Sequence, residues 1–381
     1  MKKILFITAF GATMLASCSQ DEALESAAEQ RHEISFRSSV GTRAGTLDNI
    51  ARLSNLKSGG FKASAFRYAG SGESKTVSTD PHFQNLEVQW SSDTWMHDVR
   101  YWPTKGEYVS GTTQAEGLDF LAFYPKGTEG VTFASGVMTV KDYTPAASAA
   151  NQVDLLTAYT ADQTETGASA GVPLAFKHAL SQIEVKATNS SDLYHIYIEK
   201  VEIHNVHGKE TMTLGYNKEL TWTATDDAIS SRAYSSVANS NQLGTTPTSF
   251  QKDNNKYFML IPQTTGCWKN DTQTANADAG AYFVVYAKIK NKNTGEYALG
   301  IGTTSECGKL AIPIPANDGE NIKWEAGKKY IYTLQFFKDG GGVGYVPPTP
   351  DGETPTGKEG QSAIPGNVHF SVSHNVTDWA E

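Results

Sequence analysis

The sequence predicts an all-β fold, and three observations lead to this fold class. Of its 381 residues, 39% are hydrophobic and 19% are charged, so the chain is too apolar to be disordered. It contains 34 Gly, 17 Tyr, 16 Phe and 7 Trp, which is typical of aromatic strands joined by tight turns. Its apolar residues recur in short β-branched or aromatic runs, bounded by Gly, Pro, Ser or Asn.

Residues 1–17 have the pattern of a signal peptide. Lys2 and Lys3 precede an apolar run that is too short to span a bilayer. The run ends in Leu-Ala-Ser-Cys, which resembles the lipobox of bacterial lipoproteins, so we expect Cys18 to be lipidated, for example with palmitate. We therefore expect a surface-exposed chain with a lipid anchor in the outer membrane. An ordinary signal peptide with a chance cysteine is the alternative.

The first series of strand patterns predicts an N-terminal domain over residues 46–171. A polar stretch comes before it and contains one strand pattern, at residues 33–40, with Ile34 and Phe36 on its apolar face. A short helix is expected through Leu53, and the strand patterns that follow lie at residues 61–68, 88–102, 118–125 and 131–140. A stretch rich in Gly, Ala and Thr, residues 162–171, is interpreted as a linker.

A second series predicts a C-terminal domain over residues 172–338. Its strand patterns lie at residues 172–176, 183–187, 193–206, 219–223, 257–262, 282–290, 297–301, 309–314 and 329–337. Residues 292–295, Lys-Asn-Thr-Gly, supply the turn of one hairpin. Residues 226–255 are polar and are expected to form a long surface loop.

Residues 339–381 are predicted to be a linker followed by one more strand. The linker, up to Gln361, is rich in Gly, Pro and Thr. Beyond it the apolar residues are Val368, Phe370, Val372, Val376 and Trp379, and the first three alternate with polar residues. A lone strand cannot bury its own apolar face. We therefore expect this strand to need a partner surface.

Two cysteines remain once Cys18 is assigned to lipid. Cys267 and Cys307 could form a disulfide, because the bacterial envelope is oxidising. Closing the loop of about 40 residues between them would stabilise the fold by roughly 4 kcal/mol. Two separate buried thiols are the alternative.

The charge and the motifs exclude several functions. The formal net charge is −9, whereas a protein that binds duplex nucleic acid needs a basic face, so no nucleic acid partner is expected. The sequence contains no zinc-binding spacing and no phosphate-binding glycine loop. It also lacks an acid, base and nucleophile in a context that would bring them together. We therefore predict that the protein is not an enzyme and holds no metal or cofactor.

Five segments occur in a characteristic order: residues 101–103 with 120–125, 154–156, 174–185, 260–263 and 324–332. The run Leu-x-Phe-x-His-x-Leu-Ser at 174–181 is the most specific of them. Together they resemble the fimbrillin family, the pilin-like lipoproteins of anaerobic Gram-negative bacteria. The resemblance spans most of the chain. It implies two tandem transthyretin-like β-sandwich domains, and a structural or adhesive subunit that assembles into type V pili with copies of itself or related subunits.

The resemblance also implies how assembly proceeds. A trypsin-like protease removes an N-terminal segment, and the C-terminal strand of another subunit fills the groove that opens. In this chain, residues 18–45 would be the lipidated propeptide, cleaved between Arg43 and Ala44, with Arg31 and Arg37 as other sites. Ile34 and Phe36 would belong to the occupying strand. The donor strand would carry Val368, Phe370, Val372, Val376 and Trp379. The alternative is that this strand folds back on its own domain.

Other functions stay open. The protein could be a monomeric lipoprotein that binds surface glycans, with Trp90, Trp95, Trp222 and Trp268 as a stacking platform. It could also be the anchor of a pilus. An adhesive subunit would have a receptor on a host or bacterial surface, whose identity the sequence does not give. Neither does the sequence assign a stalk, tip or anchor position.

Overall fold

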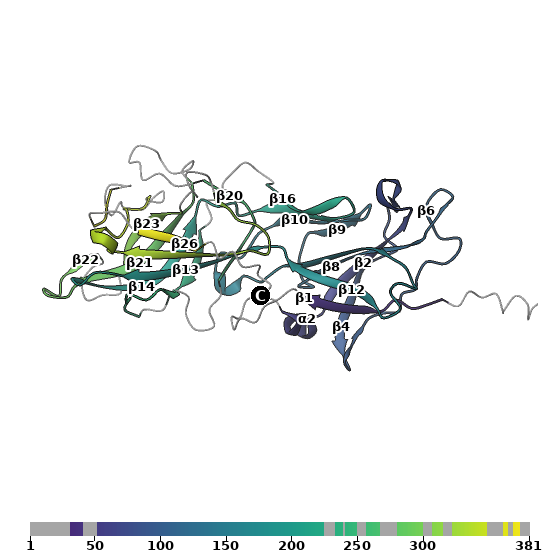
Figure 1. Ribbon diagram of the computed structural model, residues 1–381, viewed down its shortest axis with the longest axis horizontal. Coiled ribbons are helices and arrows are strands. Elements are labelled where there is room, and N and C mark those ends of the chain that lie inside the picture. Colours follow the sequence, from purple (N-terminus) through teal and green to yellow (C-terminus); the bar gives the residue numbers. More distant parts are fainter. Residues whose placement is uncertain are drawn as a thin grey trace, which may run out of the picture.

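The computed structural model describes residues 31–40, 52–224, 233–238, 241–249, 257–266, 280–299, 307–314, 322–348, 361–364 and 369–373. In these segments the fold is all-β, as predicted, and the molecule is elongated (Figure 1). Helical structure in them is limited to α2 (Leu53–Gly59) and three short 3-10 turns, η1 (Gly72–Ser74), η2 (Ala149–Asn151) and η3 (Lys338–Gly340).

The first half is built on an eight-stranded sheet with the order β1-β12-β11-β8-β2-β4-β5, where β3 also pairs with β2. Its strands are β1 (Phe36–Val40), β2 (Phe61–Ala69), β3 (Thr76–Val77), β4 (Phe83–Ser91), β5 (Thr94–Met96), β8 (Gly117–Tyr124), β11 (Leu156–Gln163) and β12 (Val172–His178). A four-stranded sheet has the order β16-β15-β10-β9, from β9 (Val131–Ala134), β10 (Val137–Tyr143), β15 (Glu210–Gly215) and β16 (Lys218–Ala224). A small hairpin pairs β6 (Tyr108–Ser110) with β7 (Thr113–Gln114).

Both faces of the large sheet are buried. Successive side chains of a strand point to opposite faces, and on β8 Phe120 packs into one hydrophobic cluster while Leu121 and Phe123 pack into another. The second cluster also contains Met138 and Met212 of the four-stranded sheet, which therefore covers that face. This double burial explains why residues 118–123 are apolar with one exception, an aspartate.

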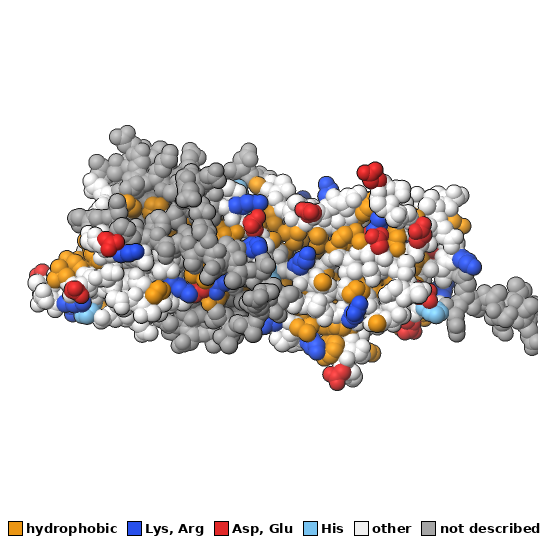
Figure 2. All heavy atoms as spheres, viewed as in Figure 1, with side chains coloured by type: hydrophobic (Ala, Val, Ile, Leu, Met, Phe, Trp, Pro, Cys, Tyr) orange, Lys and Arg blue, Asp and Glu red, His pale blue; other side chains and the backbone are white. Residues whose placement is uncertain are grey.

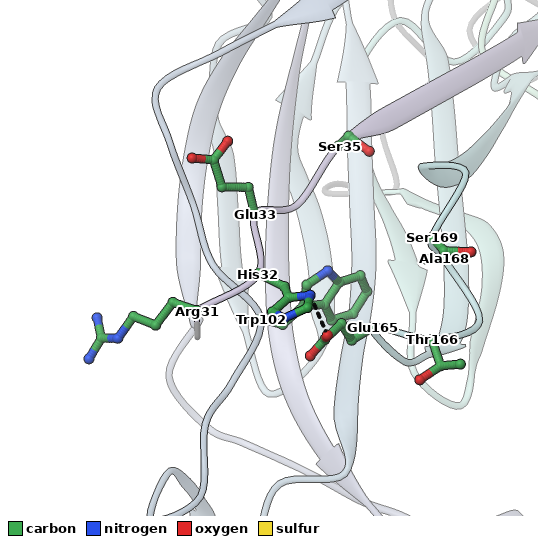
Figure 3. Close-up of a pocket in the computed structure, with 9 residues that line it drawn as sticks. All are labelled: Arg31, His32, Glu33, Ser35, Trp102, Glu165, Thr166, Ala168 and Ser169. Carbon is green, nitrogen blue, oxygen red and sulfur yellow. Dashed lines mark ion pairs between the residues drawn. The ribbon is translucent and has the colours of Figure 1, made fainter. Parts of the chain in front are cut away.

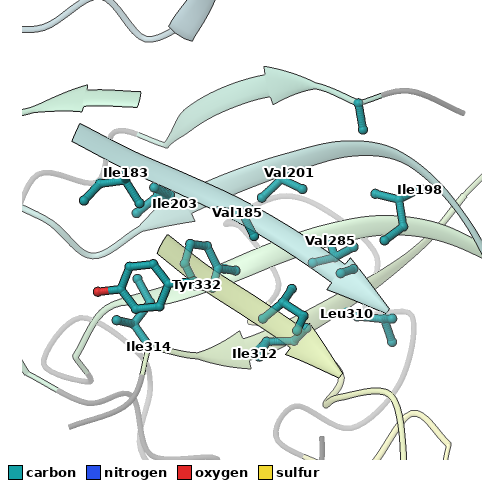
Figure 4. Packing of buried hydrophobic residues seen from close by; sticks show 14 of the residues in the cluster. Ile183, Val185, Ile198, Val201, Ile203, Val285, Leu310, Ile312, Ile314 and Tyr332 are labelled. Atoms are coloured by element: carbon teal, nitrogen blue, oxygen red, sulfur yellow. The ribbon is translucent and has the colours of Figure 1, made fainter. Parts of the chain in front are cut away.

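The second half consists of two facing five-stranded sheets. One has the order β18-β13-β25-β26, with β19 on β13, and the other has the order β17-β14-β21-β22, with β23 on β21. The strands are β13 (Ser181–Asn189), β14 (Tyr194–His204), β17 (Tyr234–Val237), β18 (Thr248–Ser249), β19 (Phe258–Leu260), β21 (Tyr282–Asn291), β22 (Tyr297–Leu299), β23 (Gly308–Pro313), β25 (Lys329–Phe336) and β26 (His369–Ser373). The short strands β20 (Thr264–Thr265) and β24 (Ile322–Lys323) pair with each other. Figure 4 shows Ile183 and Val185 of β13 together with Ile203 and Val201 of β14 in the hydrophobic cluster of the second half.

The sheets do not divide the chain at residue 171, where the sequence predicts a domain boundary. β12 pairs with β11 and β1, so it belongs to the first half. After β13 and β14 the chain returns to the first half, where β15 pairs with β10. Residues 164–171 are therefore a turn between two strands of one sheet. Small residues suit a tight turn as well as a linker, and local composition does not reveal which strands pair.

The region predicted as a linker after residue 338 is partly built into the second half. Tyr345 forms backbone bridges with Ala311 of β23 and with Ser362, and Val343 is fully buried. The amide of Ala311 donates to the carbonyl oxygen of Tyr345 at 2.7 Å, and the reverse bond measures 2.9 Å. Burial of Val343 and the backbone pairing of Tyr345 explain why this segment is fixed to the edge of the sheet.

The described surface carries mixed charge. On the face in Figure 2, lysine and arginine side chains are interspersed with aspartate and glutamate, and neither sign forms a continuous patch. Within the described residues, no helix has both the length and the apolar character needed to span a bilayer.

We predict that truncating Phe283 will destabilise the second half. This side chain is fully buried and meets the ring of Tyr332 edge-to-face at 5.2 Å. Phe283→Ala should lower the free energy of unfolding by about 3–5 kcal/mol, because it removes a large apolar side chain and leaves a cavity. Denaturation in guanidinium chloride measures this loss. Tyr108→Ala, at an aromatic residue that is 45% exposed, is the control and should have little effect.

Candidate functional site

The N-terminal segment, residues 31–40, lies in a groove of the first half with backbone partners on both sides. On one side β1 runs parallel to β12, with Phe36 opposite Val172 and Val40 opposite Phe176. On the other side the segment pairs with residues 100–102. There the amide of Ile34 donates to the carbonyl oxygen of Arg100 at 2.8 Å. The segment therefore forms backbone hydrogen bonds on both sides of the groove, with β12 on one side and residues 100–102 on the other.

The same segment contributes its apolar side chains to the core. Ile34 is 2% exposed, Phe36 6% and Val40 9%. The ring of Phe36 meets the rings of Phe61 and Phe120 edge-to-face, at 6.2 and 5.9 Å between centroids. Ile34 and Phe36, which the sequence predicts on the apolar face of an occupying strand, are thus buried in the groove. That this strand is removed during maturation stays a prediction.

A turn between β11 and β12 closes over one end of the segment. At Gly171 (φ +92°) a Cβ atom would lie 3.2 Å from the carbonyl carbon of Phe36, so only glycine allows this approach. Arg37 Nε donates to the carbonyl oxygen of Gly171 at 3.2 Å. His32 Nδ1 lies 2.7 Å from Glu165 Oε1, beside an open cavity of about 550 Å³ (Figure 3).

The C-terminal strand β26 lies in the other half of the molecule. It pairs antiparallel with β25 of its own chain, from Ile331 opposite Ser373 to Gln335 opposite His369. It is the outermost strand in the order of its sheet. In this structure the strand is folded back, which is the alternative that the sequence leaves open.

The family follows from the comparison with known proteins. The model of the fimbrillin-like family matches residues 57–346. The chain belongs to the fimbrillin-like family. This is a family of adhesion and structural proteins and not of enzymes. Among curated proteins there is no match.

Solved structures are similar to this fimbrillin-like chain over most of its length. A fimbrial protein from Bacteroides vulgatus is 18% identical, with 80% of this chain and 94% of that chain covered and a TM-score of 0.51. A candidate cell adhesion protein from Bacteroides uniformis is 14% identical, with 91% and 98% covered and a TM-score of 0.39. Another from Parabacteroides distasonis is 11% identical, with 90% and 95% covered and a TM-score of 0.43. The similarity to the Bacteroides vulgatus structure supports the all-β fold described above.

Several predicted site residues of the fimbrillin-like chain lie outside the described residues: Cys18, Arg43, Ala44, Cys267, Val368, Val376 and Trp379. Of the donor strand, the structure describes the backbone at Phe370 and Val372 and not their side chains. Cys307 has no disulfide partner among the described residues, and burial raises the pKa of its thiol to about 11 with help from the neighbouring Glu199. Its disulfide with Cys267 stays a prediction.

Of the described tryptophans that were candidates for a glycan platform, Trp222 lies on a different face of the large sheet from Trp90 and Trp95. Trp90 and Trp95 meet edge-to-face at 5.1 Å and pack on the same cluster as Phe36. Trp222 packs on the opposite face of the large sheet, where its indole nitrogen donates to the carbonyl oxygen of Ala179 at 2.8 Å. Trp268 lies outside the described residues. The three described indoles are core or half-buried packing residues.

Sequence reasoning missed a buried ionic cluster in the first half. Lys75 Nζ lies 2.8 Å from both carboxylate oxygens of Asp119 and 2.7 Å from Asp162 Oδ1. Asp119, which is fully buried, also accepts hydrogen bonds from the hydroxyl of Tyr159 at 2.9 Å and the amide of Asp162 at 2.8 Å. Burial and these two carboxylates raise the pKa of Tyr68 to about 12. The signal in the sequence was a lone aspartate within an apolar strand.

A second buried acid lies near the junction of the two halves. Glu210 of β15 is 5% exposed, and burial raises its pKa from 4.5 to about 7. The Nδ1 atom of His207 lies 3.4 Å from Glu210 Oε1. The folded protein therefore favours the neutral carboxyl over the carboxylate.

We predict that Lys75→Met will destabilise the first half by about 3–5 kcal/mol, because it leaves the carboxylate of Asp119 buried without its cation. The free energy of unfolding in guanidinium chloride measures this. Lys62→Met is the matched control. Lys62 contacts the exposed Glu87 at 3.9 Å, and such pairs contribute at most about 1 kcal/mol. Equal losses in the two variants would contradict the prediction.

We predict that Glu210→Gln will change how stability depends on pH. Because the folded pKa exceeds the unfolded one, the wild type loses stability as pH rises from about 4.5 to about 7. The glutamine variant lacks this loss, so it should be more stable than the wild type at pH 8 by about 1–3 kcal/mol. Melting temperatures at about pH 4 are the control, because the side chain is neutral there in both proteins. A stability difference that does not vary with pH would contradict the prediction.

Proposed function

We propose that this fimbrillin-like protein is a structural or adhesive subunit of a surface pilus, and that its N-terminal strand is a removable occupant of the groove. The observation that carries this proposal is the burial and backbone pairing of residues 31–40 in the groove. Three apolar side chains of this short segment are buried in the core. The stretch that joins it to the rest of the chain contains Arg43, a basic residue flanked by small ones.

Removing the segment would leave a surface that water solvates poorly. The rings of Phe61 and Phe120 would lose their contact with Phe36, and the backbone groups of β12 would lose their partners. Burying Ile34, Phe36 and Val40 contributes roughly 5–9 kcal/mol, at about 1.5–3 kcal/mol per side chain. Another strand with a similar apolar face would bury the same surface and would form backbone hydrogen bonds with β12 and residues 100–102. This is the addition of a strand at the edge of a sheet.

The C-terminal strand supplies such a face. Val368, Phe370 and Val372 alternate with polar residues, as Ile34 and Phe36 do. Cleavage after Arg43 by a trypsin-like protease would remove the lipidated Cys18 and open the groove. The freed subunit would then join others at the cell surface. The likeness to a fimbrial protein with the same overall fold supports this proposal.

A second candidate is a subunit that does not donate, such as the pilus anchor, or a monomeric lipoprotein that binds glycans. The pairing of β26 with β25 in its own chain favours a non-donating subunit. An anchor would keep both the lipid on Cys18 and the N-terminal strand. The two candidates therefore differ in whether the mature chain begins at Ala44.

We predict that Arg43→Ala will block assembly. After limited trypsin treatment, wild-type protein should begin at Ala44 and form a ladder of polymers on a native gel. Arg43→Ala should stay monomeric, because Arg37 lies within a paired strand and is bonded to Gly171.

The control is Arg43→Lys, which keeps a trypsin site and should polymerise. Polymers of Arg43→Ala with an intact N-terminus would contradict the proposal. So would wild-type protein that begins at Ala44 and remains monomeric, which would favour the second candidate.

A further inference from the structure

A second cavity lies on the face of the large sheet that does not contact the N-terminal strand. Its volume is about 640 Å³, and it lies between the strands β11 and β12 on one side and the hairpin of β15 and β16 on the other. Its walls include Tyr159, Leu214 and Leu220, which pack on the hydrophobic cluster of the four-stranded sheet. Phe36 belongs to the other cluster. The cavity is therefore separate from the groove.

The strand β16, which forms one wall of this cavity, is fixed near both of its ends. Just before it, the hydroxyl of Tyr216 donates to the carbonyl oxygen of Lys75. Near its other end, the indole nitrogen of Trp222 donates to the carbonyl oxygen of Ala179 at 2.8 Å. Between these two contacts Leu220 is only partly buried. The cavity is therefore held open by the fold and is already formed before any ligand binds.

The floor of the cavity contains a hydroxyl group without a partner. Thr157 is 2% exposed, and its Oγ1 atom has no hydrogen-bond partner among the described residues. In the sheet Thr157 lies between Phe123 of β8 and Lys177 of β12. A buried hydroxyl in such a position loses its hydrogen bonds to water and gains none in return. A change between staggered rotamers would turn it toward the cavity, where a polar group of a ligand could bind it.

The opening of the cavity is positively charged. Lys177 and Lys218 both line it and are exposed. Neither lysine has an ion-pair partner in the part of the chain that the structure describes. Glu219 is the one acidic residue that lines this cavity. The aliphatic stems of the two lysines extend the apolar walls while their ammonium groups stay in water. The opening therefore suits an anionic group, and the interior suits a hydrocarbon.

We propose that this cavity binds a small amphipathic carboxylic acid. Its carboxylate would lie between Lys177 and Lys218, its hydrocarbon body would pack on Leu214 and Leu220, and a polar group at its inner end would pair with Thr157. A saccharide fits less well, because its hydroxyl groups would be buried without partners against the leucines. The inference goes beyond the proposed function, since it gives the subunit a ligand that does not depend on strand exchange.

Binding can be measured on the purified full-length protein with ω-(dansylamino)undecanoate, whose fluorescence rises when the dansyl group leaves water. We expect binding to the wild type that octanoate reverses, and weaker binding of the matching neutral amide. Lys177→Met and Lys218→Met should each weaken binding of the carboxylate by about three- to fivefold, the effect of losing one exposed ion pair. Lys105→Met is the matched control, because Lys105 is also exposed and does not line the cavity.

The role of Thr157 has its own test. Octanoate and ω-hydroxyoctanoate are compared as competitors of the dansyl probe. Thr157→Val keeps the shape of the side chain and removes the hydroxyl, so it should weaken ω-hydroxyoctanoate relative to octanoate by about fivefold. The melting temperature of this variant should equal or exceed that of the wild type, which also shows that it folds.

Three results would overturn the inference. Absence of binding, or equal binding of the carboxylate and the amide, would show that the cavity does not select an anion. Equal losses in Lys177→Met and Lys105→Met would place the bound probe elsewhere. A ratio of the two competitors that Thr157→Val leaves unchanged would exclude the hydrogen bond at the inner end. None of these results bears on the removal of the N-terminal strand, which contacts the other face of the sheet.

Discussion

The structure depends on β8 being buried on both of its faces. Its side chains alternate between a core shared with β1 and a core shared with the four-stranded sheet. Because one of these cores includes Phe36, the N-terminal segment is structurally part of the fold although it lies at the edge of the sheet. Any strand that replaces it must present apolar side chains on one face and leave the other face to solvent.

The buried cluster around Asp119 fits the same constraint. A strand with both faces buried has no exposed position for a charge, so a carboxylate there needs partners within the protein. Lys75 and Tyr159 provide them from neighbouring elements. The cluster lies on the face of the sheet opposite Phe36, whose ring packs against Phe61 and Phe120. Ionic contacts thus stabilise the permanent core, and hydrophobic contacts fill the site whose occupant we propose to be exchanged.

The sequence predicted the all-β class, many of the strands and the apolar face of residues 33–40, because these depend on local alternation. It did not predict that β12 joins the first sheet or that β15 and β16 return to it, because pairing between distant strands leaves no local pattern. The contact between Lys75 and Asp119 joins residues 44 positions apart and was missed for the same reason. Only the unusual aspartate in an apolar run could have indicated it.

The assembly that we propose requires two strands to leave their present places. The N-terminal strand would leave the groove, and the C-terminal strand would leave β25 of its own chain. In the uncleaved chain both strands pair with their own sheets, and the N-terminal strand is joined covalently to the residues that follow it. In the assembly that we propose, cleavage after Arg43 would remove that attachment, and the N-terminal segment would then be free to dissociate from the groove. The C-terminal strand would stay attached to its own subunit, so its entry into the groove of a second copy would join two folded subunits. The proposed assembly therefore has an order, with cleavage first and release of β26 from β25 second, because only cleavage removes the covalent link of the N-terminal strand.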